Sequence, residues 1–238
     1  MNKNPNKKVS YQDLGVIGYE EAWDYQEQLL KSIVEVKVAN RTRETPTDTK
    51  NHLLFCEHPH VYTIGKSGDQ DHLLLGDSQL EKKNVQFFRT NRGGDITYHG
   101  PGQLVGYPVL DLENFYTDIH RYLRDLEESI MKTLEYFEIP AGKVEGLTGV
   151  WVDVDSLAPR KICAMGVRTS RWVTMHGFAL NINTDLSYFD NIVPCGIADK
   201  GVTSIQQELG SKVSVEEVKK VLLKRLTEVF GFRFISLK

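Results

Sequence analysis

The chain has 238 residues, of which 40% are hydrophobic and 26% are charged, and its formal net charge is −3 at pH 7. This composition is typical of a globular domain with a substantial core, and the mildly acidic balance gives no overall signal for nucleic-acid binding. No apolar run approaches the roughly 18 residues that a membrane-spanning helix needs, so we expect no membrane segment.

The first ten residues, MNKNPNKKVS, are basic and are followed by no apolar stretch of the kind found in secretory signal peptides. We therefore expect a disordered tail over residues 1–10, a single domain over residues 11–238 and a cytoplasmic protein. The three cysteines, Cys56, Cys163 and Cys195, are expected to be reduced thiols, because disulfides rarely persist in that compartment.

Apolar spacing predicts three main helices. Apolar residues recur every three or four positions over residues 18–37 and again over residues 116–137. A capping box formed by Ser214 and Glu217 predicts the start of the last helix, which we expect to end at Gly231. Two short helices are expected at DSQLEKK and SIQQEL.

Runs rich in branched and aromatic residues predict strands between these helices. The runs are LLFCEH, VYTIG, NVQFFRT, LVGYPVLDL, GLTGVWVDV, RKICAMGVR and WVTMHGFALNIN. Because strands and helices occur in groups and do not alternate one by one, the order predicts an α+β fold with a mainly antiparallel sheet.

A glycine-rich stretch, RGGDITYHGPGQ, lies between two predicted strands at residues 92–103. Glycines let backbone N–H groups approach an anion or a carbonyl closely, and Arg92 and His99 add a cation and a titratable ring. This combination favours a loop that faces a substrate, with a hairpin loop carrying an incidental histidine as the alternative.

Two nucleotide-binding motifs are each incomplete in this chain, because a required glycine is replaced. TIGKSGD has His60 where the phosphate-binding loop needs its first glycine, and Val105 stands where a dinucleotide fingerprint starting at Gly100 needs its third. The group His52, Cys56, His58 and His60 resembles a metal cluster, but Pro59 interrupts it and no second ligand pair stands at a zinc-site spacing.

Cys195 lies in NIVPCGI, between a proline and a glycine in an irregular stretch. A thiol in a loop favours a reactive group, with a buried turn cysteine as the alternative, whereas Cys56 and Cys163 lie inside predicted strands and are expected to fill the core.

Strand alternation over residues 160–168 predicts one face carrying Lys161, Cys163 and Met165 and another carrying Ile162, Ala164 and Gly166. A partly buried lysine there stabilises a nearby thiolate, although a lysine that begins a strand more often only reaches solvent.

The strand around His176 carries a lone histidine, which is more often structural than a base. Asn181 and Asn183 make one face of this strand polar, so that face is expected to border a pocket.

Several of these stretches, in order, resemble the octanoyltransferases of lipoate biosynthesis. The stretches are RGGDITYHGPGQLVGYPVLDL, GVWV, KICAMGVR, HGFALNINTDLSYFDNIVPCGI and GVTSI, and the likeness runs from about Tyr19 to Phe230. The resemblance implies the fold of the biotin/lipoate protein ligase catalytic domain, a mixed, mostly antiparallel sheet flanked by helices.

The resemblance also implies a reaction and its partners. Octanoyl-acyl carrier protein gives its acyl group to an enzyme cysteine as a thioester, and the group then passes to a lysine of a lipoyl domain. The acceptors are E2 subunits of 2-oxoacid dehydrogenases and the glycine-cleavage H protein. No metal, ATP or other cofactor is implied, because a thioester is already an activated donor. We expect no nucleic-acid or membrane partner, and a monomer.

Carried onto this chain, the resemblance implies Cys195 as the thioester cysteine and Lys161 as the lysine that promotes its ionisation. The implied substrate-binding residues are Arg92, Gly93, Gly94, Asp95, Ile96, Thr97, Tyr98, His99, Ala164, Met165, Gly166, Gly177, Phe178 and Ala179. We expect Tyr98, Met165 and Phe178 to line the acyl slot. His99 and His176 are candidates for a further base, and His99 is favoured because it belongs to the binding loop.

Three other functions remain open from the sequence. An ATP-dependent lipoate or biotin protein ligase has the same fold without a nucleophilic cysteine, an amidotransferase moves octanoyl between two carrier proteins, and a non-catalytic domain only binds a carrier. Basic residues that either face acidic partners or are ordinary surface are Lys66, Lys82, Lys83, Arg89, Arg92, Arg168 and Arg171.

Overall fold

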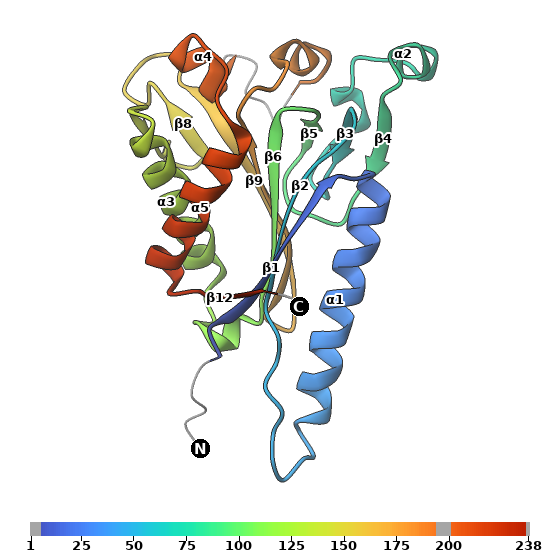
Figure 1. Cartoon of the computed structure of the whole chain (residues 1–238). Coiled ribbons are helices and arrows are strands. Elements are labelled where there is room, and N and C mark those ends of the chain that lie inside the picture. The colour runs from blue at the N-terminus through green and yellow to red at the C-terminus, as the bar shows by residue number, and fades with distance from the viewer. Residues whose placement is uncertain (1–5, 194–200, 237–238) are drawn as a thin grey trace.

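The computed structural model describes residues 6–193 and 201–236. Helices α3 and α5 cover one face of a large sheet and α1 lies on the other side, beside a second, smaller sheet (Figure 1). The helices are α1 (Tyr19–Ala39), α2 (Asp77–Lys83), α3 (Ile119–Tyr136), α4 (Ile205–Leu209) and α5 (Val215–Phe230), with short 3-10 turns η1 (Gln70–His72), η2 (Leu112–Asn114) and η3 (Leu186–Asn191).

Nine strands within the described ranges form the large sheet. Their spatial order is β12 (Arg233–Ser236), β1 (Lys8–Val16), β2 (His52–Glu57), β6 (Gln103–Val109), β10 (Val173–Asn181), β9 (Arg160–Ser170), β8 (Val150–Val152) and β7 (Ala141–Gly142), and β11 (Gly201–Val202) pairs with β9. Strand β1 is parallel to both neighbours and β11 is parallel to β9, while the other pairs are antiparallel. The predicted mixed, mostly antiparallel α+β fold is confirmed.

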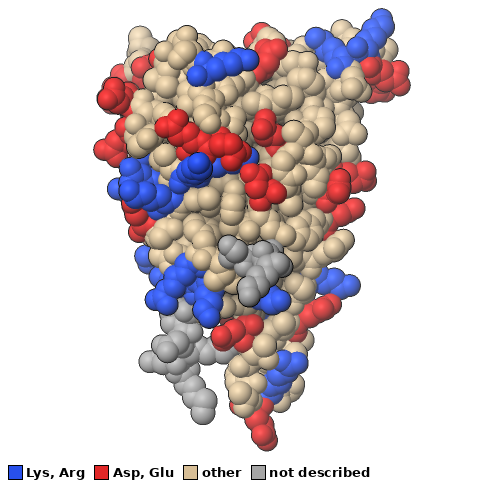
Figure 2. Space-filling model, in the orientation of Figure 1, with Lys and Arg blue, Asp and Glu red and all other residues tan. Residues whose placement is uncertain are grey.

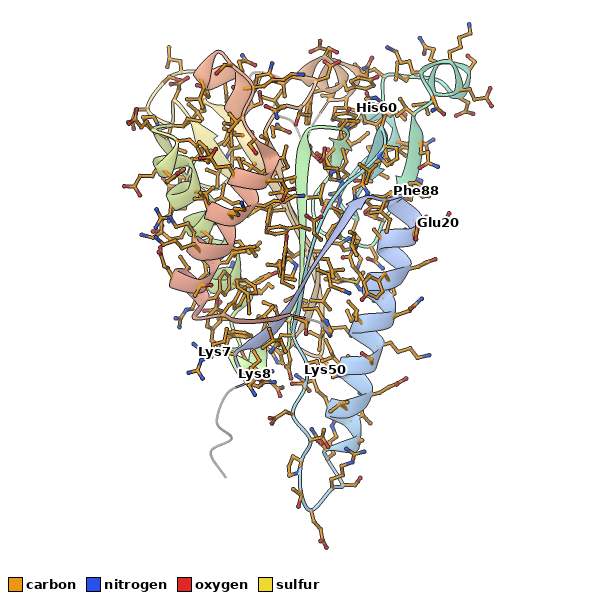
Figure 3. The ribbon with its side chains drawn as sticks, viewed as in Figure 1. Lys7, Lys8, Glu20, Lys50, His60 and Phe88 are labelled. Carbon is orange, nitrogen blue, oxygen red and sulfur yellow. The ribbon has the colours of Figure 1, made fainter. Side chains whose placement is uncertain are left out.

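The small sheet has the order β4 (Gln86–Arg89), β3 (Val61–Ile64) and β5 (Ile96–His99). It has a hydrophobic core of its own, built around Tyr62, Ile64 and Tyr98. It lies beside the N-terminal end of α1, where Glu20 and Phe88 are close together in Figure 3 and the rings of Tyr19 and Phe88 are 5.4 Å apart. The glycine-rich stretch therefore belongs to a separate sheet that is docked on the first turn of α1.

The predicted stripe of α3 is buried against α5 and the large sheet. Leu126, Ile130 and Leu134 are fully buried in one cluster with Leu222 and Leu226 of α5. Ser214 accepts a hydrogen bond from the backbone of Glu217, and the helix ends at Gly231 with φ +72°, as the capping pattern predicts. No helix in the described part of the chain is both long and apolar enough to cross a membrane.

The predicted tail is wrong for residues 8–10, because β1 begins at Lys8 and lies between β12 and β2. Val9 is fully buried. Val9 and Tyr11 pack against the core that contains α3 and α5, and pairing with β12 from Lys8 to Tyr11 and with β2 from Ser10 to Val16 holds the rest of the strand. Lys7 and Lys8 lie at its start, far from the small sheet (Figure 3).

Candidate active site

A cavity of about 270 Å³ lies between the small sheet and the face of the large sheet that carries α1. The predicted residues that line it are Arg92, Gly94, Asp95, Ile96, Thr97, His99, Lys161, Ala164, Met165, Gly166, Gly177, Phe178 and Ala179. The three predicted binding stretches, which are far apart in the sequence, therefore meet around one cavity.

The cavity also contains residues that sequence reasoning did not select. They are Tyr19, Gln103, Val105, Tyr107, Gly146, Leu147, Thr148, Trp151, Phe189, Ile192, Gly201 and Val202. Most of them lie inside the stretches that carry the resemblance, such as Trp151 in GVWV and Gln103 in RGGDITYHGPGQLVGYPVLDL, whereas Tyr19, Gly146, Leu147 and Thr148 lie outside those stretches. Asn181 lines the cavity as its polar strand face predicts, whereas the Asn183 amide bonds the backbone of Val213.

A β-bulge in β9 separates the side chains of Lys161 and Cys163. Trp151 of β8 pairs with Lys161, but the preceding Val150 pairs with Cys163, so Ile162 is an extra residue. Lys161 and Trp151 consequently face the cavity, while Cys163 and Val150 face the α3–α5 core. The predicted shared face of Lys161 and Cys163 is wrong, since simple alternation does not hold across a bulge.

Lys161 packs against an aromatic ring inside the cavity. Its Nζ lies 4.6 Å from the centroid of the Trp151 ring, at cation–π distance. The backbone beside it is also fixed, because Val202 of β11 pairs with Lys161 and the N–H of Thr203 donates to the Lys161 carbonyl at 2.9 Å. The ammonium is therefore held on one wall of the cavity.

Arg92 is buried and organises the glycine-rich loop. Its NH2 group donates to the carbonyl of Thr63 at 2.6 Å and to its hydroxyl at 2.9 Å, and NH1 donates to the carbonyl of Gly93 at 3.1 Å. On the far side of the loop, Nδ1 of His72 is 2.6 Å from the Asp95 carboxylate. These contacts fix the loop to the small sheet and to η1.

The loop touches β9 through backbone atoms. The N–H of Gly93 donates to the carbonyl of Val167 at 3.0 Å. A Cβ added at Gly166 would lie 2.8 Å from the Gly93 oxygen and 3.2 Å from Cδ of Arg92. Glycine at position 166 is thus what lets the small sheet approach the large one so closely. Gly93 itself is part of this joint and not of the cavity lining.

The expectation that Tyr98 lines the acyl slot is wrong. Tyr98 is fully buried in the small-sheet core, and its ring stacks 4.8 Å from that of Tyr188. Its hydroxyl is 2.7 Å from Nδ1 of His60. Alternation along β5 turns Tyr98 away from Thr97 and His99, which do line the cavity.

The two cavity histidines are weak bases. Burial lowers the pKa of His99 to about 3, helped by the neighbouring His58, and burial together with Arg92 lowers the pKa of His176 to about 3. Both rings are therefore neutral at pH 7, and neither fits the role of a base that accepts a proton there.

His176 is held in an unusual backbone conformation, with φ +56° inside β10. Its N–H donates to the amide oxygen of Gln26 at 2.8 Å, and its Nε2 is 2.7 Å from Oδ1 of Asn91. Because the Asn91 nitrogen donates to the Glu27 carboxylate, Oδ1 accepts, and the proton of His176 resides on Nε2. Contacts from α1 thus orient this ring.

Two of the three thiols are core groups, as predicted. Cys56 and Cys163 are free and buried, and burial raises the pKa of both thiols well above the usual range, which makes them inert. Cys195 lies outside the described residues. The segments on either side of it contribute Ile192 and Gly201 to the cavity wall.

The suspected metal cluster is dispersed in the structure. Nε2 of His58 is 3.5 Å from the Cys56 sulfur and 2.7 Å from the Tyr107 hydroxyl, whereas His60 bonds to Tyr98. Over residues 6–193 and 201–236, no group of three or more His, Cys, Asp or Glu side chains could hold a metal ion.

The suspected basic surface is smaller than the sequence suggested. Arg92 is buried and Arg168 pairs with Glu27 at 2.6 Å, so neither is a free surface cation. On the face in Figure 2, basic and acidic side chains are interspersed.

The family model described as the lipoyl protein ligase A/B catalytic domain matches residues 18–227. The chain belongs to this family. A relative named octanoyltransferase from Cytophaga hutchinsonii is 60% identical to this chain, over 97% of this chain and 96% of that one. An octanoyltransferase from Flavobacterium johnsoniae is 61% identical, over 94% of this chain and 97% of that one. An octanoyltransferase of Bacteroides fragilis is 48% identical over 90% and 94%.

Solved structures of this family share the fold. A bipartite lipoate protein ligase from Thermoplasma acidophilum superposes with a TM-score of 0.69 at 18% identity, covering 98% of this chain and 88% of that one. A lipoate-protein ligase A bound with ATP gives 0.66 at 18% identity, covering 97% and 89%. The lipoate-ligase-like architecture that the resemblance implies is confirmed.

The close contact between the two sheets at Gly166 predicts how a single added methyl group changes the stability of the fold. Gly166→Ala should lower the free energy of unfolding by about 1–3 kcal/mol, because the added Cβ collides with the Gly93 oxygen. Urea unfolding measures this. Gly18→Ala, where the Cβ meets nothing within 4 Å, is the control and should cost less than about 1 kcal/mol at this helix N-cap. Equal costs for the two variants would contradict the close joint.

The buried histidines predict a loss of stability in mild acid. Folding lowers the pKa values of His58, His99 and His176 from 6.5 to about 4, 3 and 3. Below about pH 6.5 the unfolded chain takes up protons that the folded protein does not, so the free energy of unfolding should fall by on the order of 2–4 kcal/mol between about pH 7.5 and 5.5.

Urea unfolding at several pH values checks this, with two variants that isolate the histidine contribution. His58→Gln should flatten the pH dependence, and His120→Gln, at an exposed position, should leave it unchanged. A wild-type profile that is flat over this range, or equal slopes in all three proteins, would show that these rings do not titrate as the structure implies.

Proposed function

We propose that this protein moves an octanoyl group from acyl carrier protein to the lysine of a lipoyl domain through a thioester on Cys195. The chain is an enzyme of octanoyl transfer in lipoate biosynthesis, as its kinship with octanoyltransferases at 60–61% identity supports. We further propose that acyl carrier protein is the donor, that a lipoyl domain is the acceptor and that the intermediate is a thioester.

The observation that carries the proposal is that Lys161 shares a cavity with residues that flank Cys195 in the sequence. Ile192 and Gly201, on either side of Cys195, line the same cavity as Lys161. Cys195 is the third residue after Ile192, so chain length alone limits the distance between their Cα atoms to about 11 Å. Both flanking segments are anchored, because Val193 donates to the His72 carbonyl at 2.8 Å and β11 pairs with β9.

The cavity also suits an acyl chain. Apolar side chains from several elements, among them Val105, Trp151, Met165 and Phe178, surround it. Trp151 lies against Lys161, so the apolar wall continues up to the ammonium. An octanoyl chain bound along this wall brings its carbonyl carbon toward Lys161.

In the first half-reaction the Cys195 thiolate attacks the thioester carbonyl, and the bond to the carrier thiol breaks. Lys161 takes the proton from Cys195 and returns it to the departing carrier thiol, so protons balance over the step. In the second half-reaction the acceptor lysine first loses one proton to solvent, and its neutral amine attacks the Cys195 thioester. An amide forms as the nitrogen gives a second proton to the neutral Lys161 amine, and the Cys195 sulfur leaves as a thiolate, which restores the thiolate–ammonium pair of the first half-reaction.

The scheme predicts a covalent adduct without ATP. Wild-type protein incubated with octanoyl-acyl carrier protein should gain one octanoyl group by intact-mass spectrometry. Cys195→Ser should lose the adduct, and Lys161→Met should form it about 100-fold more slowly, because the proton acceptor is gone. Cys56→Ser and Cys163→Ser are the matched controls and should keep it, since both thiols are buried and inert.

An adduct that persists in Cys195→Ser, or disappears in Cys163→Ser, would contradict the assignment. Transfer that needs free octanoate and ATP would identify a ligase instead. No adduct in the wild type would favour a non-catalytic carrier-binding domain, and a faster reaction with octanoylated H protein as donor would favour an amidotransferase.

A further inference from the structure

Hydrogen bonds link His99, Gln103, Asn181 and Thr203 in series, and we call this series the amide chain. Its first three residues line the cavity. Nδ1 of His99 is 2.8 Å from Oε1 of Gln103, and Nε2 of Gln103 is 2.9 Å from Oδ1 of Asn181. Nδ2 of Asn181 then donates to the carbonyl of Thr203 at 3.0 Å. All four residues are buried, and hydrogen bonds are stronger in such an environment than in water.

The direction of this chain is fixed by two backbone carbonyls, which can only accept. The Thr203 carbonyl requires the nitrogen of Asn181, so Oδ1 of Asn181 faces Gln103. The nitrogen of Gln103 also donates to the carbonyl of Tyr98 at 3.1 Å, which fixes that amide independently. Oε1 of Gln103 must therefore accept a hydrogen bond.

The tautomer of His99 follows. Its Nδ1 donates to Gln103 and carries the proton, which leaves a lone pair on Nε2. Nε2 is 3.4 Å from the hydroxyl of Thr63, and that hydroxyl already accepts from Arg92. An isolated neutral imidazole exchanges between two tautomers, whereas here the amide chain selects one.

The same chain connects the two halves of the site. His99 belongs to β5 of the small sheet, and Gln103 and Asn181 belong to β6 and β10 of the large sheet. Thr203 directly follows β11, and its N–H donates to the carbonyl of Lys161 at 2.9 Å. Four hydrogen bonds thus connect His99, in the glycine-rich stretch, to the backbone of Lys161.

We propose that Gln103 and Asn181 are positioning residues for the transfer reaction. They hold His99 as the Nδ1–H tautomer and fix the spacing between the acyl-binding loop and Lys161. The kinetic part of this inference rests on the proposed octanoyl transfer, and the tautomer part does not. A loose spacing lowers the turnover rate more than it weakens acyl binding, because attack at a carbonyl depends steeply on the position of the reacting groups.

Three variants and one control test the inference. Gln103→Met removes the acceptor and the donor, Asn181→Leu removes the link to Thr203, and Gln103→Glu keeps the acceptor toward His99 but loses the donor. Asn183→Leu is the matched control. Its amide also makes two bonds, at 2.8 and 3.0 Å, but to Val213 and away from the cavity.

The first readout is long-range proton–nitrogen NMR of the His99 ring, assigned with His99→Gln. The wild type and Asn183→Leu should show the Nδ1–H tautomer, and so should Gln103→Glu, because its carboxylate still accepts that proton. Gln103→Met should populate the Nε2–H form. An Nε2–H tautomer in the wild type, or no change in Gln103→Met, would overturn the role of Gln103. Gln103→Glu keeps the test open if Gln103→Met does not fold.

The second readout is steady-state transfer from octanoyl-acyl carrier protein. Gln103→Met, Gln103→Glu and Asn181→Leu should lower kcat by about tenfold or more with a smaller change in KM, and Asn183→Leu should not. Wild-type kcat in the first three, or an equal loss in the control, would overturn the positioning role. A wild type that forms no acyl adduct would defeat the proposed function, and the NMR result would still stand.

Discussion

The bulge at Ile162 places Lys161 and Cys163 on opposite faces of the large sheet, and the rest of the site depends on this placement. Without the extra residue both side chains would share one face, and either the lysine would enter the α3–α5 core or the thiol would enter the cavity. A buried ammonium in an apolar core is costly. With the bulge, the lysine reaches the aromatic wall at Trp151 and Cys163 fills the core.

The second constraint is the close approach of the two sheets. The small sheet carries the glycine-rich loop and has its own core, so its position on the large sheet has to be fixed by contacts across the joint. Backbone atoms of Gly93 and Gly166 make part of that joint, and the amide chain through Gln103 makes another part. The cavity lies between these contacts, which explains why residues from so many elements line it.

Periodicity predicted the long helices because α3 and α5 each bury one continuous stripe. It missed the start of β1, where two core residues, Val9 and Tyr11, alternate with polar ones over too short a stretch to predict a strand, and pairing with β12 and β2 supplies the rest of its stabilisation. It also misplaced Cys163 relative to Lys161, because a bulge interrupts the alternation of β9. The resemblance put Tyr98 in the cavity, although alternation along β5 turns its side chain away from Thr97 and His99 and into the small-sheet core. The resemblance selected about half of the cavity residues, and the roles of Gln103 and Trp151 follow from contacts to Asn181 and Lys161 that the sequence pattern did not indicate.

The most direct measurement is a crystal structure of the enzyme trapped as its acyl adduct before an acceptor is added. We expect an octanoyl chain inside the cavity beside Trp151 and Met165, a thioester at Cys195, and Nζ of Lys161 within hydrogen-bonding reach of the reacting carbonyl or sulfur. An acyl group on a different residue, or a chain lying outside this cavity, would contradict it.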